Sequence, residues 1–379
     1  MNQPTLFPLP GESRKTTPKT EGIKYAGSKL KLLPHILDAI SEFPIKRVLD
    51  GFAGTTRVSQ ALARRDYEVV ANDVSAWSWV FGNCYLKNQY QPEHYQRWIK
   101  HLNQLPGKDG WFTQNYGGHA KTESAIQEDG TKKPWQIHNT RKLDAIRDEI
   151  ENLTDDPVQK SVLLASLILA LDKVDSTLGH HVSYLKEWAP RSYKTLSLEV
   201  PAIFTSSPNH EVLRGDIFDA VKQAKVDLAY FDPPYGSNND KMPPSRVRYA
   251  SYYHIWTSII ENDRPKLVGK ASRREDCSDL VAGSIFEEFR RSDSGRFIAM
   301  EALERLIAST KSRFILLSYS SGGRATAEEL MTTLESRGRV ARVIEVDYKQ
   351  NIMASMRWTH DWVRDAEKAH REFLFLLEQ

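Results

Sequence analysis

The sequence predicts an α/β protein with a mainly parallel sheet, interrupted by a mainly helical insertion. Two observations lead to this prediction. Short runs rich in β-branched and aromatic residues, typical of strands, alternate with longer runs of helical periodicity. This alternation stops between about residues 88 and 206 and then resumes. Strands that alternate with helices favour a parallel sheet, because each parallel return needs a crossover connection.

The predicted elements lie towards both ends of the chain. Strands are expected at Arg47–Asp50, Tyr67–Ala71, Val226–Phe231, Phe314–Tyr319, Val340–Val346 and Glu372–Leu377. Helices are expected at Leu30–Ser41, Arg57–Arg65, His138–Leu153, Val158–Val174, Ile298–Ser309 and Thr326–Ser336. We therefore expect a flexible segment over residues 1–20, an α/β domain built from residues 21–87 and 207–379, and an inserted helical domain over residues 88–206.

The composition is that of a soluble globular protein, with 40% hydrophobic and 27% charged residues among 379. Cys84 and Cys277 lie far apart, and neither has a Cys or His at the spacing of metal ligands. The sequence therefore predicts no metal site and no disulfide framework, which fits a cytoplasmic protein. No apolar run has the length of a membrane span or resembles a signal peptide.

The net charge of +3 permits a polyanionic partner without requiring one. The distribution of charge is more informative, because one segment carries five basic residues and no acid: Arg264, Lys266, Lys270, Arg273 and Arg274. Such a run can bind phosphates, although a solvated surface loop is the more common explanation.

A glycine-containing turn follows the first predicted strand. Gly51 and Gly54 allow a sharp turn and a close approach of the backbone to a ligand, and Thr55 or Thr56 can cap the helix that follows. The next strand ends near Asp73, where an acid can bind ribose hydroxyls. The turn lacks the full dinucleotide fingerprint, so an adenosine-type ligand is favoured over a nicotinamide cofactor. The turn alone is equally consistent with no ligand.

The most informative segment reads Asp-Pro-Pro-Tyr and directly follows the buried strand Val226–Phe231. Its residues are Asp232, Pro233, Pro234 and Tyr235. Two consecutive prolines fix the backbone and remove two N–H donors, so the nearby carbonyls stay free to accept hydrogen bonds. A carboxylate, a rigid carbonyl and an aromatic face together suit an amino group on a flat ring. The alternative, a rigid surface turn, is less common at the end of a buried strand.

This arrangement matches the chemistry of adenine methylation. The amine of adenine is a poor nucleophile, because its lone pair is delocalised into the ring. Two acceptors on its hydrogens favour a pyramidal nitrogen whose lone pair points at an electrophile, such as a sulfonium methyl group. Orientation and preorganised polar groups then supply the rate, without a metal or a covalent enzyme intermediate.

These segments resemble the amino-methyltransferases that modify DNA. Asp232–Tyr235 resembles their catalytic motif, and Lys24–Lys29 resembles their opening segment. Asp50–Gly54 resembles their cofactor loop, usually Asp-x-Phe-x-Gly-x-Gly, from which this chain departs with Thr56 at the second glycine. The order of the motifs is that of the alpha group, to which the DNA adenine methylase belongs. The resemblance implies a Rossmann-like S-adenosylmethionine-dependent methyltransferase domain with a mixed seven-stranded sheet, and a target recognition domain in the insertion.

The resemblance also implies roles for individual residues. Carried over by position, the binding site for S-adenosylmethionine comprises Tyr25, Gly27, Lys29, Asp50, Phe52, Gly54, Thr55, Asp73, Asp216, Ile217 and Asp232. Catalysis falls to the Asp-Pro-Pro-Tyr residues and Lys29. The alternatives are a surface lysine at a helix N-terminus for Lys29 and a helix cap for Asp216. An initial Asp rather than Ser in the motif favours adenine over N4 of cytosine.

The expected partner is double-stranded DNA, with the target base flipped out of the stack so that Asp232 can reach its amine. Candidate DNA contacts are the basic run described above together with Arg141, Lys142, His180, His181, Lys186, Arg191 and Lys194, each of which is more commonly a solvated surface residue. We expect a monomer, either working beside a separate restriction endonuclease or as a solitary methylase.

Two other functions stay open. One is methylation of an amine in RNA or of cytosine N4, which identification of the methylated nucleoside would separate from adenine methylation. The other is a non-catalytic nucleic-acid-binding protein on the same scaffold, against which the intact Asp-Pro-Pro-Tyr segment and Lys29 argue. A nicotinamide oxidoreductase is disfavoured, because no catalytic pairing for hydride transfer is apparent.

Overall fold

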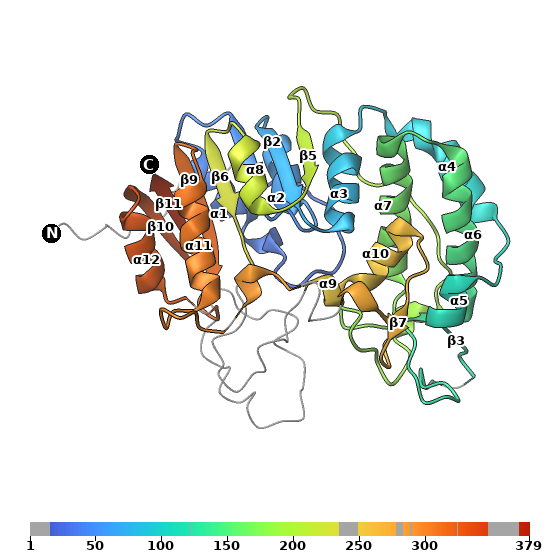
Figure 1. Ribbon diagram of the computed structural model, residues 1–379. Coiled ribbons are helices and arrows are strands. Elements are labelled where there is room, and N and C mark those ends of the chain that lie inside the picture. The colour runs from blue at the N-terminus through green and yellow to red at the C-terminus, as the bar shows by residue number, and fades with distance from the viewer. Residues whose placement is uncertain are drawn as a thin grey trace.

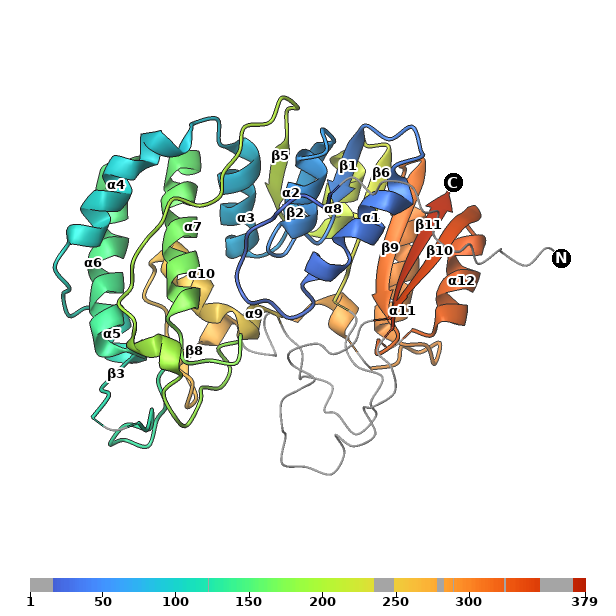
Figure 2. The same cartoon turned by 180° about the vertical axis from the view of Figure 1, so that it is seen from behind.

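The computed structural model describes residues 16–121, 123–234, 249–277, 283–288, 290–323, 325–347 and 371–379. Two parts lie side by side: an α/β part around a sheet, and a helical part beyond one edge of that sheet (Figures 1 and 2). Tyr235 of the predicted catalytic motif and most of the predicted flexible segment lie outside the described residues. Within those residues, no helix is long and apolar enough to cross a membrane.

The α/β part contains a seven-stranded sheet. Its strands are β1 (Arg47–Asp50), β2 (Glu68–Asp73), β5 (Glu211–Arg214), β6 (Leu228–Phe231), β9 (Phe314–Ser320), β10 (Arg339–Asp347) and β11 (Arg371–Glu378). Its helices are α1 (Leu33–Ile40), α2 (Arg57–Ala63), α8 (Ile217–Gln223), α11 (Ile298–Ser309) and α12 (Ala327–Glu335), with short turns η1 (Lys29–Lys31) and η5 (Ile285–Glu287). The predicted α/β class and the mixed seven-stranded sheet are confirmed.

The strand order is β10-β11-β9-β6-β1-β2-β5. The central pairs are parallel, and β11 is antiparallel to both β9 and β10. From β1 the chain proceeds through β2 to β5 in one direction, whereas β6 lies on the other side of β1 and leads to β9. The strand order therefore reverses between β1 and β6, and in open α/β sheets ligands bind outside the carboxyl ends of the strands at such a point.

Helices cover both faces of the sheet, and the strands alternate accordingly. On one face, residues such as Val48, Tyr230 and Leu374 pack with α1 and α2. On the other face, their sequence neighbours Leu49 and Phe231 pack with α8, α11 and α12. This period-two alternation of buried residues fixes the register, because a slip of one residue would exchange the two faces.

The helical part has its own elements. Its helices are α3 (Ala76–Gly82), α4 (Pro92–Gln104), α5 (Trp111–Tyr116), α6 (Ile137–Leu153), α7 (Pro157–Lys173), α9 (Tyr249–Tyr252) and α10 (His254–Glu261), with the turns η2 (Asn83–Lys87), η3 (Pro190–Tyr193) and η4 (Glu275–Cys277). Two short strand pairs join β3 (Gly117–Gly118) to β4 (Trp135–Gln136) and β7 (Leu267–Val268) to β8 (Arg273–Arg274).

Helix α7 lies at the centre of the helical part. The carboxylate of Asp156 caps it by accepting hydrogen bonds from the backbone N–H groups of Val158 and Gln159, and Pro157 occupies its first turn. The span 161–171 is buried throughout. A helix that is apolar around most of its circumference must be surrounded, and α3, α6 and η2 pack against α7.

The structure differs from the predicted domain boundaries in two places. Helix α3, turn η2 and residues 249–277 fall within the predicted α/β domain, but Trp77, Tyr85, Tyr253 and Trp256 belong to the same buried cluster as α6 and α7. The helical part is therefore completed by a segment that follows β6, so a boundary drawn as one continuous insertion misses it.

Most expected helices and strands are present within a few residues of their predicted ends. The apolar pattern predicts no strand at β5, because its four residues are half-buried or exposed and lack an apolar run. The helices without a predicted counterpart are α3, α4, α5, α8, α9 and α10. All except α4 have eight residues or fewer, and α4 starts without a side-chain cap. In α8 the side chain of Asp216 caps the helix by accepting a hydrogen bond from Phe218 N at 2.7 Å.

Arg147 joins α6 to the end of α10 inside the helical part. Its side chain is 2% exposed, and it donates to the carbonyls of Ile259 and Ile260 and to the carboxylate of Glu151. A buried guanidinium with these partners replaces the hydrogen bonds that water would otherwise supply to the helix C-terminus.

We predict that Arg147→Ala lowers the free energy of unfolding by about 2–4 kcal/mol, because it leaves two buried carbonyls without donors. Urea denaturation followed by circular dichroism measures this change. Arg141→Ala is the matched control on the same helix, since Arg141 is exposed and pairs with Asp109 at the surface; it should change stability by less than about 1 kcal/mol. Equal losses in the two variants would contradict the assignment.

Candidate active site

The turn between β1 and α2 is held by the neighbouring strands. Gly51 N donates to the carbonyl of Tyr230 at 3.0 Å, and Ala53 N donates to the carbonyl of Asn72 at 2.9 Å. Gly54 N donates to Oδ2 of Asp73 at 2.9 Å. The turn is therefore anchored to β2 and β6 at once, beside the reversal of strand order.

Glycine is required at two places in this turn. A Cβ on Gly51 would lie 2.8 Å from side-chain atoms of Ile217 and Phe231. Gly54 has φ of +50°, and a Cβ there would lie 3.2 Å from the ring of Tyr25. The sequence predicts that glycine is needed at these two positions. The contacts identify Tyr25 and Ile217 as neighbours of the turn.

Thr56 takes the backbone conformation of the glycine that it replaces. Its φ and ψ are 58° and 18°, in the left-handed region that a β-branched residue rarely adopts. Thr56 is the N-cap residue of α2, but its side chain makes no capping hydrogen bond and instead accepts one from Gln60 Nε2 at 3.2 Å. Thr55 is also buried. The departure from the usual motif therefore leaves the backbone path of the loop in the glycine-like conformation.

Asp73 ends β2 beside this turn. Its Oδ1 accepts hydrogen bonds from Ser75 N at 2.9 Å and Ser75 Oγ at 2.7 Å, and its Oδ2 accepts the bond from Gly54. Burial raises the pKa of this carboxyl, while the three hydrogen bonds oppose the rise. The side chain is partly exposed, so it is placed to accept a further donor from a ligand.

Two buried oxygens at the same edge have no hydrogen-bond partner among the described residues: Oδ1 of Asp50 and Oδ1 of Asn72. The other carboxylate oxygen of Asp50 accepts from Ser59 Oγ at 2.6 Å. Burial raises the pKa of Asp50 to about 7, with the Ser59 hydrogen bond acting against the rise. Because buried acceptors normally have partners, these oxygens fit a ligand that carries N–H or O–H donors.

The opening segment lies against the turn. The ring of Tyr25 stacks on Tyr253 with centroids 4.6 Å apart and lies 5.4 Å from Tyr249. Ala26 N donates to the hydroxyl of Tyr253 at 2.7 Å. Gly27 has φ of +77°, and a Cβ there would lie 2.9 Å from the hydroxyl of Tyr249. Aromatic residues of the helical part thus fix the segment that leads to Lys29.

Lys29 and Asp232 meet at the carboxyl end of β6. Lys29 Nζ lies 3.0 Å from Oδ1 of Asp232 and 3.5 Å from Oε2 of Glu372 on β11. Burial raises the pKa of Asp232 to about 6; the ammonium of Lys29 opposes this rise, and the charge of Glu372 adds to it. Lys29 is only 6% exposed, so its interpretation as a surface lysine is wrong.

The remaining residues predicted for the cofactor site lie next to the same turn. Phe52 makes edge contacts with Phe231 and Phe286, at centroid distances of 6.3 and 5.2 Å. Ile217 is buried, and Asp216 is exposed and caps α8 through one of its two carboxylate oxygens. Pro233 is buried and Pro234 half-buried, directly after Asp232. The structure therefore brings all the described residues of the predicted cofactor and catalytic sets to one edge of the sheet.

Several predicted DNA contacts are internal to the protein. His180 and His181 are 3% and 1% exposed, and burial lowers the pKa of both. Arg274 is 4% exposed and pairs with Asp263 and Asp276. These findings correct the expectation for the three residues, because side chains packed in the core do not reach a DNA surface.

Two other candidates are half-buried and used within the fold. Lys142 donates to the carbonyls of Asn103 and Leu105, at 2.8 and 2.6 Å. Arg191 donates to the carboxylate of Asp175 at 2.7 Å and to a neighbouring carbonyl. Both stabilise contacts between elements of the helical part, so we do not retain them as DNA contacts.

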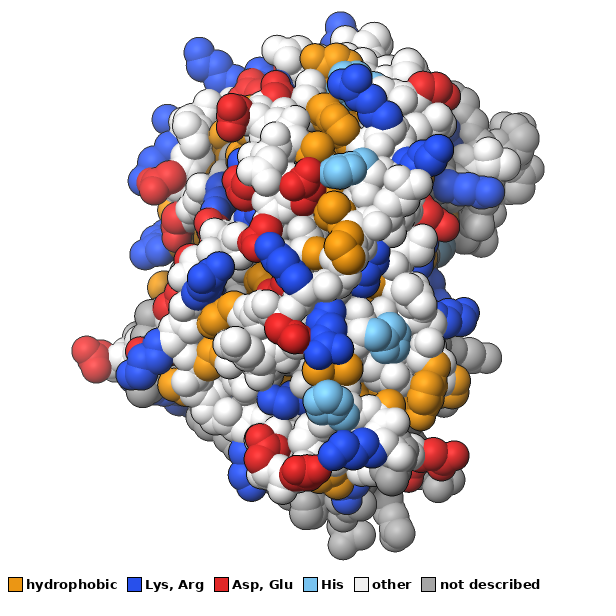
Figure 3. Space-filling model, turned by 90° about the vertical axis from the view of Figure 1, so that its right-hand side faces the viewer, with side chains coloured by type: hydrophobic (Ala, Val, Ile, Leu, Met, Phe, Trp, Pro, Cys, Tyr) orange, Lys and Arg blue, Asp and Glu red, His pale blue; other side chains and the backbone are white. Residues whose placement is uncertain are grey.

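The exposed candidates are Arg141, Lys186, Lys194, Arg264, Lys266 and Lys270, with Arg273 half-buried. At the far end of the helical part, basic and acidic side chains are interspersed (Figure 3). Ion pairs such as Arg141 with Asp109 and Lys108 with Asp148 account for this mixture. That end therefore presents no continuous basic surface, and Arg141 is an unpromising DNA contact.

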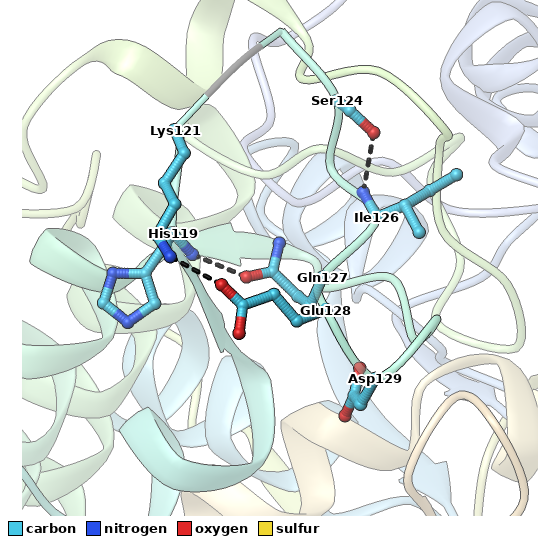
Figure 4. A pocket seen from close by; sticks show the side chains of 7 residues that line it. All are labelled: His119, Lys121, Ser124, Ile126, Gln127, Glu128 and Asp129. Atoms are coloured by element: carbon cyan, nitrogen blue, oxygen red, sulfur yellow. Dashed lines mark hydrogen bonds and ion pairs between the residues drawn. The ribbon is translucent and has the colours of Figure 1, made fainter.

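A hollow in the loop between β3 and β4 is formed by residues of that loop alone (Figure 4). His119 N donates to Gln127 Oε1 at 2.8 Å, and Lys121 pairs with Glu128. The hollow belongs to the helical part, away from the loops at the carboxyl edge of the sheet. It is an open, polar surface feature, and the residues that bear the chemistry lie elsewhere.

Sequence reasoning missed Tyr253, Asn72 and Glu372 as parts of the site. Asn72 Nδ2 donates to the carbonyls of Gly51 and Gly215, at 3.3 and 3.2 Å, and so links the turns after β1 and β5. Glu372 is the first residue of a predicted strand that is otherwise apolar. This acid beside an apolar run is the signal in the sequence that could have indicated its place in the site. Nothing in the sequence pairs Tyr253 with the distant opening segment.

Residues 25–281 match the model of the D12 class N6 adenine-specific DNA methyltransferases. The chain belongs to this family. The match begins at Tyr25 and includes the turn after β1, Asp73 and the Asp-Pro-Pro segment. Glu372 lies beyond the matched range.

Individual relatives are modification enzymes. Over 83% of this chain, the sequence is 29% identical to the modification methylase StsI of Streptococcus sanguinis. Over 86% of the chain, it is 28% identical to the type II methyltransferase M.NlaIII of Neisseria lactamica. Over 86% of the chain, it is also 27% identical to the modification methylase LlaI of Lactococcus lactis subsp. lactis. The matches cover 46% of StsI, 50% of LlaI and 92% of M.NlaIII. The chain thus spans about half the length of two of these relatives and nearly all of the third.

We predict that Tyr253→Phe loosens the opening segment of this methyltransferase. The variant keeps the stacked ring but removes the acceptor of the Ala26 amide, so the amides of residues 24–28 should exchange at least about tenfold faster. Hydrogen–deuterium exchange followed by mass spectrometry measures this. Tyr184→Phe is the matched control, because the hydroxyl of Tyr184 donates to the carbonyl of Ala271, within the helical part. Unchanged exchange in Tyr253→Phe would sink the assignment.

Proposed function

We propose that this chain transfers a methyl group from S-adenosylmethionine to N6 of adenine in double-stranded DNA. The observation that carries the proposal is the position of Asp232. It ends β6 beside the reversal of strand order, next to the glycine turn after β1, with Lys29 at 3.0 Å. A carboxylate at this place, followed by two prolines, offers acceptors for an amine next to a nucleoside site.

The turn and its neighbours fit the methyl donor. The unpartnered oxygens of Asp50 and Asn72 suit its amino and hydroxyl groups, and Asp73 is placed to accept from ribose hydroxyls. We assign to this site Tyr25, Gly27, Lys29, Asp50, Phe52, Gly54, Thr55, Asp73, Asp216, Ile217 and Asp232. Bound S-adenosylmethionine supplies the methyl group on a positively charged sulfur, which keeps the electron pair of the broken C–S bond.

The protein's own residues orient the amine. Asp232 and the carbonyl of Pro233 accept the two N–H hydrogens, which directs the lone pair of the nitrogen towards the methyl group. The nitrogen forms the new N–C bond with this lone pair and then loses one proton to water. Preorganised acceptors supply the rate, because they need no rearrangement as positive charge develops on the nitrogen.

The proposed DNA surface lies on the helical part, on the same side as the carboxyl ends of the strands. In Figure 1, β3, β7 and α9 lie along this lower side. Tyr184 donates to the carbonyl of Ala271, and Ala125 N donates to the carbonyl of Lys186, both at 2.8 Å, so three loops form one surface. Lys186, Lys270 and Arg273 are the cations that we retain there for phosphate contacts.

The rest of the biological assignment follows the names of the relatives. We infer that the chain acts in a restriction–modification system beside a separate endonuclease. We also propose that the chain works in the cytoplasm as a monomer. The target adenine is flipped out of the duplex, because its amine cannot reach Asp232 while the base is stacked and paired.

We predict that expression in a host without DNA methylation places N6-methyladenine at one recurring short sequence. Asp232→Ala should abolish the modification, with a loss of at least about 10³-fold in rate, because the main acceptor of the amine is gone. Sequencing that detects modified bases measures the modification by the wild type and its loss in the Asp232→Ala variant. Asp227→Ala is a control from the residue before the same strand, since the carboxylate of Asp227 accepts hydrogen bonds from the backbone N–H groups of Lys46 and Arg47.

Each other result selects a different function. N4-methylcytosine in the genome would replace adenine by cytosine as the substrate base. An unmodified genome with methylated RNA would replace DNA by RNA. DNA binding without any methylation by the wild type would favour a non-catalytic binder, and a folded Asp232→Ala variant with full activity would overturn the proposed mechanism.

We predict an acid limb near pH 6 in the rate of methyl transfer. Both oxygens of the Asp232 carboxyl can accept hydrogen bonds only when the group is ionised. Because the pKa of Asp232 is raised to about 6, the rate of methyl transfer falls as the pH drops through this value. The ionisable groups around it are Lys29, Glu372, Asp50, Tyr25 and Tyr230. Single-turnover rates between about pH 5 and pH 8 measure the limb. A flat profile through pH 6 would contradict this role of Asp232.

A further inference from the structure

Glu372 is a buried acid beside buried apolar residues on the same face of β11. Side chains alternate along β11, so Glu372 shares a face with Leu374 and Leu376, both of which are buried against α1 and α2. Glu372 itself is only 9% exposed. A carboxylate is rarely buried unless a cation compensates its charge, so its position calls for an explanation.

Lys29 is a cation that compensates this charge. Three distant segments meet here: η1 near the N-terminus supplies Lys29, the end of β6 supplies Asp232, and the start of β11 supplies Glu372. The ammonium of Lys29 is 3.0 Å from the carboxylate of Asp232 and 3.5 Å from that of Glu372. One ammonium thus stands between two carboxylates, and the lysine is held on both sides.

This sharing matters for the proposed reaction. Asp232 has to accept a hydrogen bond from the amine, yet one of its oxygens is paired with Lys29 in the structure. A lysine ammonium has three N–H donors and a flexible stem, so it can move between neighbouring acceptors. Glu372 offers such an acceptor. With Glu372 absent, the ammonium would stay on Asp232 and compete with the substrate amine.

We propose that Glu372 is a positioning residue that draws Lys29 away from Asp232 when the adenine amine binds. The inference rests on the proposed function, and it adds a residue outside the range matched by the family. Glu372 touches neither the amine nor the methyl group and acts through Lys29. Its negative charge also makes the Asp232 carboxylate more basic, because like charges disfavour ionisation of a neighbour.

The test is Glu372→Gln, which keeps the size of the side chain and removes its charge. We expect the single-turnover rate near pH 7.5 to fall by about tenfold or more, since Lys29 then competes for Asp232. We also expect the acid limb to move to lower pH, because loss of a negative neighbour lowers the pKa of Asp232. A purely structural role would lower the rate without moving the limb.

Glu378→Gln is the matched control. Glu378 ends the same strand and pairs with Arg313 and Arg339, far from Lys29. This variant should keep both the wild-type rate and the wild-type acid limb. Thermal unfolding of both variants shows whether β11 has remained in place.

The outcomes separate the two proposals. A wild-type protein without activity overturns the proposed function, and the inference falls with it. An active wild type whose Glu372→Gln variant has the same rate and the same acid limb overturns the inference alone. Should Glu372→Gln fail to fold, Glu372→Asp decides: it keeps the charge but withdraws the carboxylate from Lys29 by one methylene group. A reduced rate together with an acid limb at lower pH then supports the inference, whereas a wild-type rate, or a reduced rate with an unmoved limb, overturns it.

Discussion

The site depends on the parallel pairing of β1 with both β2 and β6. This pairing brings the turn after β1, the carboxylate of Asp73 and the carboxylate of Asp232 to one edge of the sheet. From β1 the chain proceeds through β2 to β5 and then returns past β1 to β6, so the strand order reverses between β1 and β6, where open α/β sheets bind ligands. A nucleoside site and an acceptor for an amine therefore become neighbours through topology alone, although Gly54 and Asp232 are far apart in the sequence.

Charge at this edge is arranged so that a single cation serves several acids. Asp50, Asp73, Asp232 and Glu372 are all buried or half-buried, and Lys29 pairs with two of them. Burial raises the pKa of Asp50, Asp73 and Asp232. An excess of buried acid is costly in a protein without ligands, and it becomes favourable when a cationic ligand supplies the missing positive charge. A sulfonium compound with an amino group is such a ligand.

The sequence was sufficient for the parts that depend on local pattern. Apolar runs located six of the seven strands, and the order of motifs located the turn, Asp73 and Asp232. It failed where tertiary partners decide. β5 is too polar to stand out, His180 and His181 look like surface residues until the core closes over them, and Glu372 acquires its meaning only from Lys29. Nor does any local rule place the segment after β6 in the helical part.

The opening segment links the helical part to the chemistry. Glu21 exchanges hydrogen bonds with Gln60 of α2 and accepts one from Tyr85, while Lys24 is bound by Asp172 and Asp175 at the end of α7. A few residues later the same segment supplies Tyr25, which packs on the cofactor turn, and Lys29. Because both parts of the protein hold this segment, the position of Lys29 beside Asp232 depends on contacts with the sheet and with the helical part alike.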